Sequence, residues 1–107
     1  MEWRVEVLNE IVQRELDELP KDIRARLVWI SRLISQVGLE TIREPHVKHL
    51  EGKLWEIRLA GRDGIARALY VTAFGRRVVI VRAFVKKTQQ TPQSEINLGL
   101  RRAEEVR

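Results

Sequence analysis

Residues 54–85 read LWEIRLAGRDGIARALYVTAFGRRVVIVRAFV, and this stretch decides the fold. Leu54–Ala60 alternates apolar and charged residues with a period of two, the pattern of a strand buried on one face. The next two segments, Ile65–Phe74 and Arg77–Val85, are richer in apolar residues, as strands covered on both faces are. Turns are expected at Gly61–Gly64 and Phe74–Arg76. The stretch predicts three consecutive strands joined as hairpins.

The residues before this stretch predict a strand and a helical hairpin. Glu2–Leu8 alternates polar and apolar residues like a half-buried strand. Asn9 suits the N-cap of a short helix, which Pro20 interrupts. Pro20 then opens a second helix, whose apolar stripe ends at Gly38.

The two remaining segments predict a loop and a last helix. Leu39–Lys53 lacks clear periodicity, so we expect a connecting loop. Residues 91–95, TPQSE, open a final helix, with Glu95 placed to close a capping box. The order β-α-α-β-β-β-α predicts an α+β fold. We expect a mainly antiparallel sheet, an N-terminal helical hairpin on one face and a C-terminal helix.

The composition limits the chain to one small domain, residues 1–107. The absence of cysteine excludes a disulfide framework, a thiolate nucleophile and a cysteine zinc site. We expect no metal and no cofactor. No segment approaches the roughly 20 apolar residues of a membrane span, and none has the apolar core of a secretory signal. The sequence therefore predicts a cytoplasmic protein without membrane contact.

The positive charge gathers in the last third of the chain. Residues 1–75 carry 12 Lys and Arg against 12 Asp and Glu, whereas residues 76–107 carry 8 against 3. The whole surplus of +5 therefore lies after residue 75. This distribution indicates an anion-facing surface built from the last third.

The expected hairpins predict a row of arginines. A turn centred on residues 62–63 places Arg58 across from Arg67, and a two-residue turn at residues 74–75 places Arg67 across from Arg82. Like charges opposite each other destabilise a sheet, so the row calls for an anion such as a phosphate backbone. The alternative is that each arginine pairs with a nearby carboxylate, Glu56 or Asp63 for example.

Three runs of sequence carry a family resemblance: LWEIR at residues 54–58, GRDGIARALY at residues 61–70, and AFVKKTQQTP at residues 83–92. Together they resemble the phage-derived Gp49-like group of HigB toxins, within the RelE/ParE superfamily. The resemblance extends over the chain from about Leu50 onward. The N-terminal strand and hairpin match the superfamily in pattern only.

The resemblance implies the toxin of a type II toxin–antitoxin system. Such a toxin is an endoribonuclease that cuts messenger RNA, usually in the ribosomal A site formed by 16S rRNA. The RNA 2′-hydroxyl attacks the adjacent phosphate and leaves a 2′,3′-cyclic phosphate. The implied partner is a helix-turn-helix antitoxin of the HigA type.

The resemblance also assigns roles to four basic residues. Arg67 occupies the place of a catalytic or phosphate-binding arginine, and Arg58 takes the basic position of the preceding strand. Lys86 and Lys87 stand where relatives place basic residues near the scissile phosphate. We expect Arg58, Arg67 and Lys87 to be catalytic and Lys86 to contact RNA.

Further RNA contacts are expected from Arg82, Lys53 and Arg62. The general base is left unassigned, because Glu56 stands where RelE has a second lysine and the last helix has no matching tyrosine.

His49 is a candidate proton acceptor, although a lone loop histidine is more often a surface residue. Glu56 is a comparable candidate, with a structural ion pair as the alternative. Tyr70 falls on the face of Trp55, which favours a core role.

Two other function classes stay open. A ParE-like relative that inhibits gyrase shares the fold without the ribonuclease residues, and the retention of Arg58 and Arg67 speaks against it. A nucleic-acid-binding module with a decayed active site is the second alternative.

Overall fold

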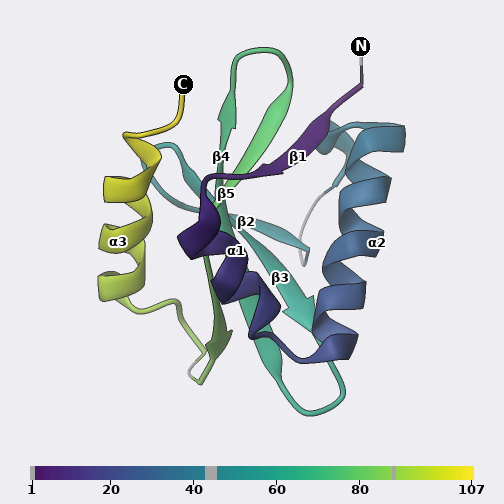
Figure 1. Cartoon of the computed structure of the whole chain (residues 1–107), viewed down its shortest axis with the longest axis vertical. Coiled ribbons are helices and arrows are strands. Elements are labelled where there is room, and N and C mark those ends of the chain that lie inside the picture. Colours follow the sequence, from purple (N-terminus) through teal and green to yellow (C-terminus); the bar gives the residue numbers. More distant parts are fainter. Residues whose placement is uncertain (1, 43–45, 88) are drawn as a thin grey trace.

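The computed structural model describes residues 2–42, 46–87 and 89–107, which form an α+β fold (Figure 1). Its elements are β1 (Arg4–Val7), α1 (Glu10–Asp17), α2 (Lys21–Val37), the 3₁₀ turn η1 (Leu39–Thr41), β2 (Val47–Glu51), β3 (Leu54–Ala60), β4 (Ile65–Ala73), β5 (Arg77–Lys86) and α3 (Gln93–Ala103). The sheet has the strand order β1-β5-β4-β3-β2. Only β1 and β5 run parallel among the described strands, so the sheet is mainly antiparallel, as predicted.

The two faces of the sheet carry separate apolar clusters. The helical hairpin α1–α2 covers one face, where Ile57, Ala68 and Ile80 join its core. Helix α3 covers the other face, packing on Leu54 and Leu69. Figure 1 shows α2 and α3 on opposite sides of the sheet. Because strand side chains alternate between faces, β2 to β5 contribute to both clusters, whereas β1 contributes Val5 and Val7 to the cluster under the helical hairpin.

Local sequence signals place the helical hairpin. Asn9 caps α1, and its side chain accepts a hydrogen bond from the Val12 amide at 3.0 Å, as the sequence predicts. Helix α2 follows Pro20 and ends at Gly38, whose φ of 89° suits glycine. None of the helices within residues 2–42, 46–87 and 89–107 is long and apolar enough to cross a membrane.

The prediction of a loop over Leu39–Lys53 is wrong. The segment holds η1 and strand β2, so the described sheet has five strands rather than the four expected. Strand β2 joins β3 through a two-residue turn in which Gly52 has a φ of 55°. A glycine at the first position of a two-residue loop is itself a hairpin signal. This short edge strand brings Lys48 opposite Glu56.

The predicted register is correct in the first hairpin and wrong in the second. Arg58 lies opposite Arg67, but Arg67 lies opposite Phe84 and not Arg82. The β4–β5 turn has three residues, two of them with positive φ, and an irregularity near Leu69 shifts the register again. Because the total shift is two residues, Arg82 keeps the same face of the sheet as Arg67.

A partly buried ion network holds α1 and α3 against β5. Glu95 does not close a capping box; its carboxylate accepts two hydrogen bonds from Arg82, at 2.7 and 3.0 Å. The Glu15 carboxylate of α1 pairs with Arg82 at 3.0 Å and with Arg102 at 2.9 Å. The network therefore ties the helices on the two faces to one strand.

Glu15 is expected to hold this network together, because its carboxylate pairs with both Arg82 and Arg102. Burial raises the pKa of Glu15, but the hydrogen bonds from Arg102 and from the Ala83 amide, with the charge of Arg82, outweigh it and hold the pKa below its ordinary 4.5. A carboxyl with a lowered folded-state pKa stabilises the fold above its unfolded-state pKa, and this contribution is lost as pH falls. Glu15→Gln should reduce the free energy of unfolding at pH 7 by roughly 2 kcal/mol.

Urea denaturation at pH 7 and below pH 4 measures this loss, which should shrink in acid. The control is Glu18→Gln, an exposed carboxylate just after α1. An equal loss at both pH values would contradict the role of the Glu15 charge.

Candidate active site

Four cations gather at one end of the sheet, on the face of α3. We call them the basic cluster: Lys48 of β2, Arg58 of β3, Arg67 of β4 and Lys86 of β5. The strand register aligns them, because Arg58 faces Arg67 and the first residue of β4 faces Lys86. Figure 1 shows the β3–β4 turn and the segment after β5 at this same end.

A buried carboxylate lies within the basic cluster. Glu56 is 1% exposed and forms an ion pair with Arg67, which is 5% exposed. The Thr91 hydroxyl donates a second hydrogen bond to Glu56, at 2.5 Å. This finding confirms the structural ion pair for Glu56. Both carboxylate oxygens are engaged, so Glu56 is not a free proton acceptor.

Arg67 is anchored on two sides. Its Nη1 faces Glu56, and its Nη2 donates to the Gln89 carbonyl at 3.4 Å. Lys86 donates to the same carbonyl oxygen through Nζ. The Nε of Arg67 is buried without a hydrogen-bond partner in the described part of the chain. Burial lowers the pKa of Arg67.

The remaining cations of the cluster are available to an anion. The Arg58 side chain is exposed and has no hydrogen-bond or ion-pair partner within the described residues. Burial lowers the pKa of Lys86. Three neighbouring cations lower it further: Arg67, Arg58 and Lys48. The single carboxylate of Glu56 does not balance the four cations of the basic cluster. Such a surplus of neighbouring positive charges is typical of an anion-binding site.

His49 lies on the opposite face of the sheet from the basic cluster. Its Nε2 donates to the Gly52 carbonyl at 2.6 Å, and its ring is 5.0 Å from that of Trp55. It lines a pocket of about 750 Å³ that also includes Tyr70. Tyr70 is buried, as the sequence predicts, and burial raises its pKa to about 12. The sheet therefore separates His49 from Arg58 and Arg67.

The other sequence-predicted residues are dispersed. Arg82 is on the α3 face but is paired with Glu95, so the alternative of carboxylate pairing holds for it. Lys87 is exposed, directly after β5. Lys53 and Arg62 are exposed in the β2–β3 and β3–β4 turns. Of these residues, Lys87 is adjacent in sequence to a member of the basic cluster, Lys86.

Sequence reasoning missed three members of the site. The loop predicted over Leu39–Lys53 leaves Lys48 out of the sheet, although Gly52, at the first position of the two-residue turn before Leu54, is a hairpin signal. Thr91 and Gln89 reach Glu56 and the basic cluster through tertiary contacts. No local pattern distinguishes them from residues of a solvated linker.

The sequence profile described as "Phage derived protein Gp49-like (DUF891)" matches residues 14–104. The chain belongs to this Gp49-like family. The family match covers α2, the whole sheet except β1, and α3. It therefore includes every residue of the basic cluster.

Two solved structures resemble this Gp49-like chain. A chain of the archaeal RelE–RelB complex from Pyrococcus horikoshii OT3 has a TM-score of 0.58 and 24% identity, over 79% of this chain and 96% of that one. A double arginine-to-alanine mutant of the E. coli toxin RelE, in the free state, has a TM-score of 0.67 and 16% identity, over 95% and 98%. These likenesses show a RelE-like fold. No curated protein sequence matches the chain.

Removing one partner of the buried Glu56–Arg67 ion pair is expected to destabilise the fold more than removing both. Glu56→Gln should reduce the free energy of unfolding by about 3–5 kcal/mol, because it leaves the Arg67 charge buried and uncompensated. The double variant Glu56→Leu, Arg67→Met should recover most of this loss, since it removes both charges.

Urea denaturation of both variants tests this expectation. Asp63→Asn is the control, because that carboxylate is 83% exposed in the β3–β4 turn. A double variant as unstable as the single one would show that the pair stabilises the fold beyond charge compensation.

Proposed function

We propose that this chain is the toxin of a toxin–antitoxin pair and acts as an endoribonuclease on messenger RNA. The convergence of the basic cluster around one buried carboxylate carries the proposal. Lys48, Arg58 and Lys86 supply charge at the surface, while Arg67 supplies a fixed charge beneath it. Such an arrangement suits a phosphodiester, whose charge grows in the transition state.

Each cation has a distinct proposed role. The guanidinium fork of Arg58 binds the non-bridging phosphoryl oxygens, because it is exposed and unpaired in the described part of the chain. Lys86, with its lowered pKa, protonates the leaving 5′ oxygen. Arg67 acts electrostatically from its anchored position, and Lys87 steers RNA from the adjacent surface.

The proposed reaction is transesterification within the RNA. The 2′-oxygen attacks phosphorus and forms a 2′,3′-cyclic phosphate, while the bond from phosphorus to the 5′ oxygen breaks. The 5′ oxygen takes the Lys86 proton, and the 2′-hydroxyl proton passes to water. Neither His49 nor Glu56 enters this step, because His49 lies on the other face and both carboxylate oxygens of Glu56 are engaged.

An antitoxin is the proposed partner. The archaeal structure that shares this fold is named as a RelE–RelB complex, which supports a bound protein partner here. We propose a helix-turn-helix antitoxin of the HigA type and, as the place of cleavage, the ribosomal A site. Both follow from the resemblance of residues 54–92 to the HigB group.

Arg58→Ala and Lys86→Ala should each reduce cleavage by about 10²–10³-fold, the usual loss when one charge-stabilising donor is removed. The test is induced expression of each variant, with growth measured and messenger RNA 5′ ends mapped. Upstream fragments should end in a 2′,3′-cyclic phosphate. Arg67→Ala is a weaker test, because it also removes the partner of buried Glu56.

The matched control is Arg32→Ala, an exposed arginine of α2 on the other side of the sheet. It should arrest growth and cut messages like the wild type. Growth arrest with intact messages in the wild type would overturn the ribonuclease proposal. Equal cleavage by Arg58→Ala, Lys86→Ala and the wild type would remove the basic cluster from the reaction.

A further inference from the structure

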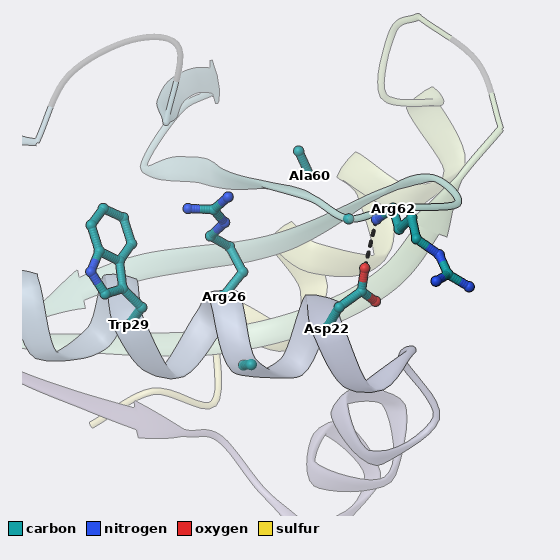
Figure 2. A pocket seen from close by; sticks show the side chains of 7 residues that line it. Asp22, Arg26, Trp29, Ala60 and Arg62 are labelled. Carbon is teal, nitrogen blue, oxygen red and sulfur yellow. Dashed lines mark hydrogen bonds between the residues drawn. The ribbon is translucent and has the colours of Figure 1, made fainter.

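A second pocket opens between α2 and the β3–β4 turn (Figure 2). Its volume is about 480 Å³, and its lining includes Asp22, Arg26, Trp29, Gly61 and Arg62. Figure 2 shows Arg26 and Trp29 rising from α2 toward the end of β3. The pocket is on the other side of the sheet end from the basic cluster and shares no residue with it.

Trp29 gives the pocket an exposed aromatic surface. The side chain is 48% exposed, whereas α2 buries Ile23, Leu27 and Ile30 against the sheet. The Arg26 guanidinium carbon lies 5.5 Å from a Trp29 ring centroid. The His46 ring approaches Trp29 edge-on, with the ring centroids 6.5 Å apart. The exposed part of the Trp29 ring offers a surface on which a planar ring stacks.

The turn that forms the other wall is held firmly. The Asp22 carboxylate accepts the Arg62 amide at 2.6 Å and the Ile23 amide at 3.0 Å. These backbone donors, that of Arg62 first, lower the pKa of Asp22. A Cβ at Gly61 would lie 2.5 Å from the Ile23 side chain, so only glycine permits this close approach. The pocket is therefore preformed.

The pocket is positively charged overall and close to the proposed active site. Asp22 directs its charge at backbone amides, and Arg26 is exposed. The Arg62 side chain is 88% exposed, and its ion pair with Asp63, at 3.6 Å, is also on the surface. Ala60, which lines the pocket, is two residues along β3 from Arg58, or about 7 Å. Arg26 and Arg62 thus extend the positive charge of Arg58 around the end of the sheet, along a path that an RNA backbone can follow.

We propose that this pocket binds a nucleotide that flanks the scissile phosphate in a single-stranded RNA. Its base stacks on Trp29, and its phosphates contact Arg26 and Arg62. The inference rests on the proposed function and extends it to a substrate-binding subsite. An RNA strand fits better than a protein segment, because one aromatic face and two guanidinium groups match one base between two phosphates.

The test is the binding of a labelled, mixed-sequence 2′-O-methyl oligonucleotide, which lacks the attacking hydroxyl and cannot be cut. Fluorescence anisotropy of the full chain gives the Kd over a series of salt concentrations. Trp29→Ala should weaken binding at least about fivefold, and Trp29→Phe should retain most of the affinity. Arg26→Gln and Arg62→Gln should each lower the salt slope by about 0.7.

Two exposed α2 residues outside the pocket provide matched controls. Val28→Ala and Arg32→Gln should bind like the wild type, and thermal unfolding checks that every variant is folded. An oligonucleotide with abasic sugars should bind Trp29→Ala and the wild type equally, because it offers no base to stack.

Unchanged RNA affinity in Trp29→Ala would overturn the proposal. If this variant instead loses affinity for the antitoxin, the pocket is a protein docking site. Cleavage by the wild type is measured in parallel. If the wild type cleaves RNA and Trp29→Ala binds it with unchanged affinity, only the proposed subsite is contradicted. If binding depends on Trp29 but no cleavage occurs, the proposed reaction is contradicted and the subsite is supported.

Discussion

The buried ion pair between Glu56 and Arg67 is the constraint on which the site depends. Removing two charges from water costs several kcal/mol per ion, so each must find partners inside the fold. Glu56 pairs with Arg67 and accepts a hydrogen bond from the Thr91 hydroxyl, and Arg67 also donates to the Gln89 carbonyl. The pair therefore draws the segment after β5 back onto β3 and β4. In doing so it sets the position of Lys86, which shares that carbonyl.

Arg58, Arg67 and Arg82, which the sequence predicts as one row, have different surroundings, and these surroundings separate their functions. Arg82 is neutralised by Glu15 and Glu95 and joins the helices to the sheet. Arg67 is buried and anchored, while Arg58 is exposed and unpaired within the described residues. Only the last has a guanidinium fork free for an external anion. Charge near a site is thus distinct from charge available to a ligand.

Two features that escaped the sequence reasoning have specific physical causes. The β4–β5 register depends on Arg76, which adopts a left-handed φ of 58° that few non-glycine residues adopt. Strand β2 is short and lies at the edge, where partly exposed residues weaken the apolar alternation. The first hairpin was predictable because Gly61–Gly64 marks its turn and residues 55–59 alternate apolar and charged side chains.

The sequence by itself determined the helical hairpin, three central strands, and the pairing of Arg58 with Arg67. These follow from caps, turns and periodicity, which are local properties of the chain. Only the tertiary structure decided that Glu56 is buried, that His49 lies on the far face, and that Thr91 closes on Glu56. Burial and ion pairing join residues distant in the sequence, so their energies depend on packing that no local pattern records.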